Sequence, residues 1–313
     1  MIENRVLITG SKGLIGNALK SCLERLGIQV VGMDIDYPTH HEAYGDIRDS
    51  KRFEELAAQC IGIVHLAAVS RVIWGERNPK LCWEINVNST DNMLKTIRNL
   101  SNQPWIVYAS SREVYGQQTR LPVSEDADLL PLNIYARSKL FAENLVSKYR
   151  EHGLQTATVR FSSVYGSADD HVDRVIPAFC RVAALGGVMR IEGKDNILDF
   201  THIDDVVDGL IKIIKKLQEG CMDLPTIHFT SGRATTLWQV AELAKRASHY
   251  SVKYMEAPSR TFDVSSFLGN PRLAHRLLNW KAKIPLQDGI ARLVEQYMQE
   301  AELDEVDQCY SVR

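Results

Sequence analysis

Five short apolar runs in the first half of the chain alternate with longer segments whose apolar residues recur at helical spacing. The runs are continuously apolar, which is typical of strands that helices cover on both faces. Strands joined by helices in this way form a parallel sheet. The pattern therefore predicts an α/β fold with a doubly wound parallel sheet, whose strands lie near residues 5–10, 29–34, 61–68, 104–111 and 155–163.

Local signals mark where several helices begin and end. Gly27 and Gly153 each follow a helical segment, where a left-handed residue commonly ends a helix. Asp204 is placed to cap the helix in "LDFTHIDDVVDGLIKIIKKL". Further helices are expected near 175–185 and from about Thr236.

The regular alternation ends after Gly166. We expect residues 1–165 and about 198–230 to form the sheet domain, and residues 166–197 and about 231–300 to form a smaller, mixed C-terminal region. The polar residues 301–313 are expected to form a flexible tail.

Composition narrows the class of protein. The 313 residues are 45% hydrophobic and 24% charged with a formal net charge of −2, which argues against nucleic acid as the main partner. The six cysteines are scattered without a CxxC pair, so we expect neither a metal site nor disulfides. The apolar runs are shorter than the roughly 20 residues of a membrane span, and no signal peptide is apparent, so a cytoplasmic protein is expected.

A glycine-rich turn follows the first strand. "ITGSKGLIG" places Gly10, Gly13 and Gly16 where a chain must turn sharply and approach a pyrophosphate at a helix N-terminus, with Leu14 and Ile15 in the same turn. Asp34 ends the second strand, where a carboxylate can bind an adenosine ribose and repel a 2′-phosphate. These features predict a Rossmann-type domain that binds NAD. The alternatives are a tight turn without a ligand, and a turn role for Asp34.

Tyr135 and Lys139 are four residues apart and share one face of a predicted helix. A free tyrosine has a pKa of about 10, but a lysine cation and an oxidised nicotinamide nearby would favour the phenolate. Such a tyrosine could take the proton of a substrate hydroxyl. The alternative is an ordinary amphipathic helix that carries both residues.

Eight motifs occur in an order that resembles extended short-chain dehydrogenases/reductases, in the nucleotide-sugar epimerase/dehydratase branch that includes UDP-glucose 4-epimerases. The resemblance extends to about residue 295. The motifs are GxxGxxG at 10–16, "GDIRD" at 45–49, "HLAA" at 65–68, "NVNST" at 86–90, "SSREVYG" at 110–116, "YARSK" at 135–139, "VRFSSVYG" at 159–166 and "LDFTHIDDVV" at 198–207.

The resemblance implies roles for individual residues. Ser111 would hydrogen-bond the reacting sugar oxygen, Tyr135 would be the base, and Lys139 would bind the nicotinamide ribose and lower the pKa of the tyrosine. The other residues implied to contact or lie near the dinucleotide are Asp46, Ile47, Leu66, Ala67, Ala68 and Asn86. The smaller region would bind the substrate, and the helix of Tyr135 and one near 90–100 would form a homodimer.

The reaction depends on Arg112 and Glu113. In members that the chain resembles, the place of Glu113 holds the base that removes the C5 proton in dehydratases, and decarboxylases also carry a glutamate there. Arg112 occupies the place of an acid in one dehydratase subgroup, and a guanidinium cannot donate that proton. Another dehydratase subgroup has a neutral residue there, so dehydration stays open. Glu113 could equally be a structural residue paired with a basic side chain, and Arg112 is too near in sequence to be an assured partner.

The substrate side departs from the family pattern. Leu198 stands where an arginine usually holds the diphosphate, and Ser163 stands where an asparagine is usual. Arg260, Arg174 and Arg71 are the cations expected to bind substrate, the alternative for Arg174 and Arg260 being solvated surface arginines.

The sequence thus predicts an NAD-dependent nucleotide-sugar epimerase that oxidises C4 transiently. A 4,6-dehydratase or decarboxylase that uses Glu113 is the first alternative. A non-catalytic dinucleotide-sensing protein is a more remote one.

Overall fold

The computed structural model describes residues 4–311. A six-stranded parallel sheet forms its centre, in the order β2-β1-β3-β4-β5-β9. The first five strands fall within the predicted runs, which confirms the doubly wound sheet. The strands are β1 (Arg5–Thr9), β2 (Gln29–Met33), β3 (Gly62–His65), β4 (Trp105–Ser111), β5 (Thr156–Phe161) and β9 (Ile227–Phe229).

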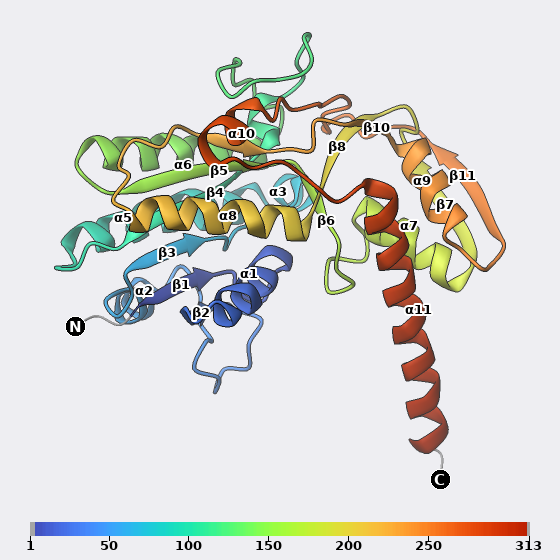
Figure 1. Cartoon of the computed structure of the whole chain (residues 1–313), viewed down its shortest axis with the longest axis horizontal. Coiled ribbons are helices and arrows are strands. Elements are labelled where there is room, and N and C mark those ends of the chain that lie inside the picture. The colour runs from blue at the N-terminus through green and yellow to red at the C-terminus, as the bar shows by residue number, and fades with distance from the viewer. Residues whose placement is uncertain (1–3, 312–313) are drawn as a thin grey trace.

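Helices cover both faces of this sheet. Successive strand residues point to opposite sides, so each continuously apolar strand has two apolar faces to bury. Val6 and Ile8 pack with α1 (Leu14–Arg25), α8 (Ile203–Gln218) and α10 (Arg272–Leu278). Leu7 packs on the other face. The helices there are α2 (Ser50–Ala57), α5 (Ser89–Asn99) and α6 (Ile134–Glu151). Figure 1 shows α8 lying along one face of the sheet.

Most of the expected helix boundaries are confirmed. Gly27 and Gly153 follow α1 and α6 with φ of 75° and 96°, in the left-handed region that glycine adopts without strain. Thr236 caps α9 (Leu237–Arg246), and α7 spans Val175–Leu185. The prediction that Asp204 caps α8 is wrong. The helix begins at Ile203, and the Nδ1 atom of His202 accepts the N–H of Asp204 at 3.2 Å.

Two small sheets and a second apolar core make up the rest of the fold. One sheet has the order β10-β8-β6 and the other pairs β11 with β7, while α7, α9 and α11 (Leu286–Ser311) contribute to the core that packs with them. The strands are β6 (Ser163–Tyr165), β7 (Gly187–Glu192), β8 (Ile197–His202), β10 (Ala234–Thr236) and β11 (Val252–Ala257). Short helices complete the chain: α3 (Val72–Arg77), α4 (Pro79–Trp83), the π-helical η1 (Glu84–Asn88) and the 3₁₀ turn η2 (Arg112–Tyr115).

The division into two domains stays a prediction. Helix α10, from the part assigned to the smaller region, packs on the main sheet through Ala274 and Leu278. The expected flexible tail also stays a prediction, since residues 301–311 are the end of helix α11 (Leu286–Ser311) and residues 312–313 lie outside the described chain.

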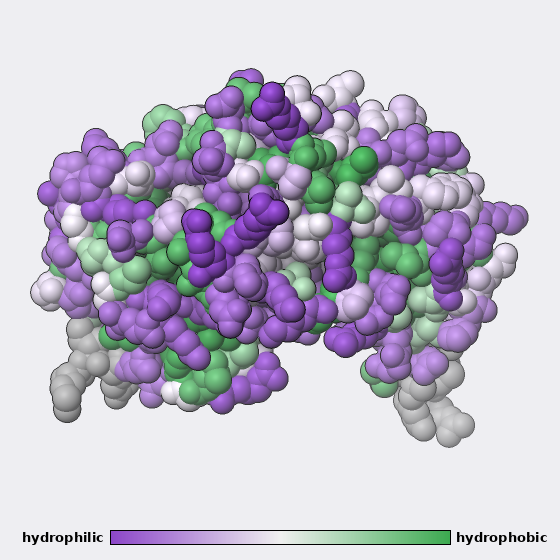
Figure 2. Space-filling view, turned by 45° about the horizontal axis from the view of Figure 1, so that its top comes forward, coloured by the Kyte–Doolittle hydropathy of each residue, from purple (hydrophilic) through white to green (hydrophobic). Residues whose placement is uncertain are grey.

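The molecular surface is largely polar. Figure 2 shows hydrophilic side chains over most of the visible face, with hydrophobic ones in small groups between them. Within residues 4–311, no helix is both long and apolar enough to cross a bilayer.

Candidate active site

A cleft of about 1060 Å³ opens at the carboxyl ends of the parallel strands, between the main sheet and the smaller region. Open α/β sheets place their ligands at this edge. The sequence-predicted residues that line the cleft are Gly10, Gly13, Leu14, Ile15, Gly16, Asp34, Asp46, Ile47, Leu66, Ala67, Ala68, Arg71, Ser111, Glu113, Tyr135, Lys139, Ser163, Arg174 and Arg260.

Asn86 is the predicted residue that does not line the cleft. Its buried side chain accepts the N–H of Val69 at 2.8 Å and donates to the hydroxyl of Ser138 at 2.9 Å. It therefore ties the loop after β3 to helix α6, behind the cleft.

The glycine-rich turn has the shape that a dinucleotide requires. Gly10 has φ of 72°, and a Cβ there would lie 2.7 Å from the backbone nitrogen of Ala67. A Cβ on Gly16 would lie 2.1 Å from the carbonyl oxygen of Gly10. Gly13 is the N-cap of α1, and no side chain of the described residues caps the helix there. Backbone amides at this helix end are suited to a pyrophosphate, so the turn fits NAD.

Asp34 follows β2, and backbone N–H groups hold its carboxylate in place. Its carboxylate accepts the N–H of Lys12 at 2.9 Å and that of Asp36 at 3.0 Å. The side chain lines the cleft beside the glycine-rich turn, where remaining lone pairs can accept ribose hydroxyls. Both the turn role and the ribose role are compatible with this geometry.

Beside Asp46 the cleft is lined by a residue that the sequence did not predict, Arg48. Arg48 forms an ion pair with Asp46 and contacts Glu84 at 3.3 Å. Its hydrogen bond lowers the pKa of the Asp46 carboxyl. The signal was present in "GDIRD", because Arg48 lies two residues after Asp46.

Ser111, Tyr135 and Lys139 come together where β4 ends and α6 begins. Ser111 is the last residue of β4, and its Oγ accepts the N–H of Glu113 at 3.2 Å. Asn133 caps α6 and so places Tyr135 in the first turn of the helix. The ammonium of Lys139 donates to the carbonyl of Ala109 at 2.8 Å. All three side chains line the cleft.

Burial controls the protonation of this group. Desolvation raises the pKa of Tyr135 to about 12, and the charge of Glu113 adds to that rise, whereas hydrogen bonding to Ser111 and the charge of Arg174 lower it. Burial also lowers the pKa of Lys139 to about 8. The protein groups alone therefore keep Tyr135 protonated at neutral pH, and a phenolate needs the charge of bound cofactor nearby.

Glu113 is buried and has two partners. Its Oε1 lies 2.9 Å from a guanidinium nitrogen of Arg112, and its Oε2 accepts from the amide of Asn133 at 3.3 Å. Arg112 in turn lies over the ring of Phe267. Arg112, although adjacent to Glu113 in sequence, is therefore its ion-pair partner, because the 3₁₀ turn η2 brings the two side chains together.

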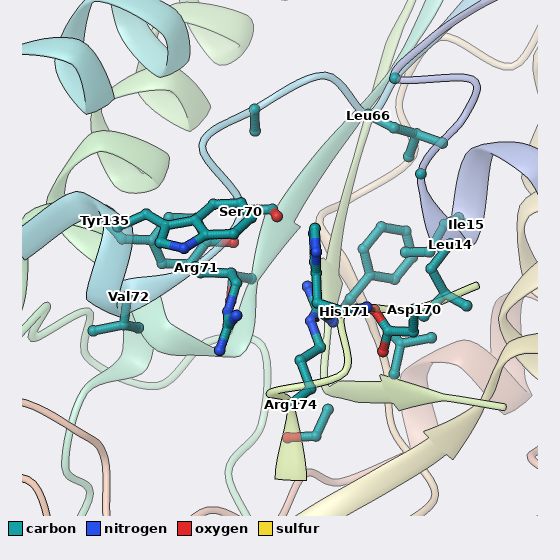
Figure 3. A pocket seen from close by; sticks show the side chains of 18 of the residues that line it. Leu14, Ile15, Leu66, Ser70, Arg71, Val72, Tyr135, Asp170, His171 and Arg174 are labelled. Atoms are coloured by element: carbon teal, nitrogen blue, oxygen red, sulfur yellow. Dashed lines mark hydrogen bonds and ion pairs between the residues drawn. The ribbon is translucent and has the colours of Figure 1, made fainter. Parts of the chain in front are cut away.

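The predicted substrate-side arginines are each paired with an acid. Arg174 lies 3.4 Å from Asp170, Arg260 lies 2.7 Å from Glu192, and Arg71 pairs with Asp173. Figure 3 shows Arg71 and Tyr135 on one side of the cavity, and His171, Asp170 and Arg174 on the other. Cleft-lining residues that sequence reasoning missed include Trp74, Asp170, His171, Glu192 and Asp263.

Proteins of known activity are similar to this chain in sequence. The chain is 26% identical over 310 residues to a UDP-glucose 4-epimerase of Lactobacillus helveticus, covering 89% of this chain and 92% of that one. It is 28% identical to UDP-glucuronate 4-epimerase 3 of Arabidopsis thaliana, covering 94% and 76%.

Solved structures extend the similarity to the whole fold. MoeE5, determined with UDP-glucuronic acid and NAD, has 25% identity and a TM-score of 0.83 over 95% of this chain and 99% of its own. TunA, an NAD-dependent NDP-hexosamine 5,6-dehydratase, has 25% identity and a TM-score of 0.81 over 95% and 98%.

The family itself is settled by a sequence profile. The profile of the NAD dependent epimerase/dehydratase family matches residues 6–222, which is more than half of the chain. The predictions of an enzyme and of NAD as its cofactor are thereby confirmed. This protein belongs to the NAD-dependent epimerase/dehydratase family.

Proposed function

We propose that the protein is a nucleotide-sugar 4-epimerase. The observation that carries the proposal is the meeting of Ser111, Tyr135 and Lys139 in one cleft with the glycine-rich turn. This places a proton acceptor and a hydroxyl donor beside a dinucleotide site. Relatives named as UDP-glucose and UDP-glucuronate 4-epimerases support the same reaction class.

The protein groups act on the sugar hydroxyl. The glycine-rich turn and Asp34 would hold NAD, which would supply the hydride acceptor for the oxidation and the hydride donor for the reduction that follows. Tyr135 takes the proton of the sugar hydroxyl and later gives it back, while Ser111 holds the same oxygen by a hydrogen bond. The Lys139 cation favours the phenolate form of Tyr135. The oxidised sugar would rotate within the cleft and present its other face, so that reduction there gives the 4-epimer.

The partners of Glu113 favour epimerisation over elimination. A 4,6-dehydratase needs a free base for the C5 proton and an acid for the departing 6-hydroxyl. Glu113 is already held by Arg112 and Asn133, and Arg112 cannot act as the acid. A dehydratase or decarboxylase remains the second candidate, since a buried carboxylate does stand beside Ser111 and a dehydratase is among the similar structures.

The substrate is a nucleotide sugar held by arginines. We propose that Arg174 and Arg260 bind the diphosphate, in place of the arginine that Leu198 replaces, and that Arg71 and Ser163 line the sugar end. UDP-glucose and UDP-glucuronate are the first candidates, because the named relatives act on these sugars.

A homodimer also belongs to this proposal. Trp83 on α4 and Phe141 on α6 are 37% and 46% exposed, and their ring centroids lie 5.3 Å apart. An exposed aromatic pair on the helices next to α5 suits a helix-to-helix interface with a second copy. A cytoplasmic location stays a prediction.

A substrate panel tests the proposed reaction. The purified protein is incubated with UDP- and dTDP-linked hexoses and hexuronates, and the products are identified by NMR. We expect the 4-epimer of at least one substrate, and a Tyr135→Phe variant is expected to be slower by a factor of about 10²–10⁴. A 4-keto-6-deoxy product would overturn epimerisation in favour of dehydration. A Tyr135→Phe variant with full activity would contradict the role of Tyr135 as the base. A protein that binds NAD but converts none of the sugars would favour the remote alternative, a protein that senses the dinucleotide.

A further inference from the structure

Two segments that are distant in sequence meet across the cleft. One is Arg71 with helix α3, and the other is the loop 166–174 that joins β6 to α7. The guanidinium of Arg71 pairs with the carboxylate of Asp173, and the rings of Trp74 and His171 meet edge to face with centroids 4.8 Å apart. We call these four side chains the cleft bridge. Figure 3 shows its two labelled members, Arg71 and His171, on opposite sides of the cavity.

The bridge lies at the reacting end of the cleft. A Cβ on Gly75 would lie 3.2 Å from the backbone nitrogen of Tyr135, so α3 packs directly against the start of α6. Glu76 fixes the same junction, because its carboxylate accepts the N–H of Ile134 at 2.9 Å. On the other side, Arg174 is near enough for its charge to act on Tyr135. The bridge therefore spans the space beside Tyr135.

The contacts are suited to opening and closing. The side chain of Arg71 is 10% exposed and lies over the ring of Trp74, whereas the side chain of Asp173 is 63% exposed. An ion pair with one partner largely in water is weak, so the loop can leave and return without great cost. Arg71 is thus buried on one side of the cleft, and Asp173 reaches it from an exposed part of the loop on the other side.

The proposed reaction creates a need for such a closure. Oxidation removes a proton and a hydride from the sugar, and both must return to the same molecule after it has turned over. If the ketone leaves before it is reduced, the hydride stays on the cofactor and the proton stays on the enzyme. The enzyme then has no ketone to which it can return them. The ketone also lacks the O–H donor of the substrate, so enclosure has to replace part of its binding.

We propose that the cleft bridge retains the oxidised sugar until it is reduced, and so determines how many turnovers end in the epimer and how many in a released ketone. The proposal rests on the proposed function. It makes Arg71, Trp74, His171 and Asp173 residues that control the fate of the intermediate, not groups that transfer protons.

Removing one charge of the bridge tests the proposal. Asp173→Asn breaks the ion pair on the exposed side. We expect the ratio of released 4-keto sugar to epimer, measured by mass spectrometry after trapping the ketone with hydroxylamine, to rise about fivefold, the factor that corresponds to a partly exposed ion pair. Reduced cofactor is expected to accumulate in parallel. Hydrogen exchange at residues 167–174 should also become faster, which measures the loop without turnover.

Controls separate this result from general damage. Val172→Ala changes an exposed neighbour in the same loop, whose side chain is 50% exposed, and should leave the ratio unchanged. Asp173→Glu keeps the charge of the exposed partner and should keep the low ratio. If Asp173→Asn folds poorly, His171→Ala removes the ring contact and should raise the same ratio.

Two results would contradict this inference without contradicting the proposed function. One is a wild-type protein that epimerises while Asp173→Asn and His171→Ala release no more ketone. The other is unchanged hydrogen exchange in the loop of both variants. A wild-type protein that forms no epimer from any sugar would instead contradict the proposed function.

Discussion

Lys139 is a buried cation whose position serves chemistry more than stability. Its side chain is 4% exposed, and burial lowers its pKa to about 8 from the ordinary value of 10.5. The only hydrogen bond that its ammonium donates within the described chain goes to Ala109. The folded protein therefore holds a charge that its surroundings disfavour.

Replacing this lysine should separate stability from activity. Lys139→Met removes a charge whose burial costs about 3 kcal/mol and a hydrogen bond that contributes about 1 kcal/mol. We expect the variant to be inactive yet more stable than wild type by about 2 kcal/mol in denaturant unfolding at pH 7, with equal cofactor content in both proteins.

The same shift in the pKa of Lys139 predicts how the free energy of unfolding changes with pH. Between pH 8 and 10.5 the unfolded chain binds more protons at this lysine than the folded chain, so wild type gains stability as pH rises through that window. The advantage of Lys139→Met should shrink accordingly. A variant that is less stable than wild type at pH 7 would contradict this account of Lys139.

At the scale of the element, the turn between β1 and α1 is tightly constrained. The Cβ of Gly16→Ala would lie 2.1 Å from the carbonyl of Gly10, so the turn would have to open. We expect this variant to lose NAD binding by at least about tenfold in calorimetric titration, because the backbone amides would no longer face the pyrophosphate.

Gly27 provides the matched control. It has φ of 75° but nothing within 4 Å of an added Cβ, and it ends the same helix away from the cleft. Gly27→Ala should cost about 1 kcal/mol of stability and leave NAD binding intact. Equal NAD affinity for Gly16→Ala and wild type would contradict the proposed pyrophosphate site.

The elements also show what a sequence can reveal. The parallel strands were predictable because burial on both faces leaves continuous apolar runs. The start of α8 was not, since Asp204 is a usual capping residue and His202 is an unusual one. Glu113 and Arg112 were recognised, but their pairing depends on the 3₁₀ turn η2, which no apolar pattern marks.

At the scale of the whole molecule, contacts between distant segments leave no signal in the sequence. Arg71 was expected as a substrate-side cation, but its pairing with Asp173, which is 102 residues away, depends on how the smaller region sits over the sheet. Trp74 and His171 were missed for the same reason. Motifs identify residues that act on a ligand, whereas contacts across the cleft are a property of the tertiary fold.

The proposed dimer is tested by charge. Phe141→Glu puts a carboxylate where the exposed ring meets Trp83, and an interface there would be disrupted by its desolvation. We expect wild type to behave as a dimer and the variant as a monomer in size-exclusion chromatography with light scattering. A monomeric wild type, or a dimeric variant, would contradict an interface at α4 and α6.

The most direct test of the central claim follows the hydrogen at C4. A nucleotide sugar that is accepted in the panel is prepared with deuterium at C4 and converted in ordinary water, and both epimers are analysed by NMR. Transient oxidation in a closed cleft predicts that the deuterium stays at C4 in the product and that no solvent hydrogen enters C5. Loss of the C4 deuterium to solvent, or exchange at C5, would contradict a 4-epimerase that removes and returns the same hydride.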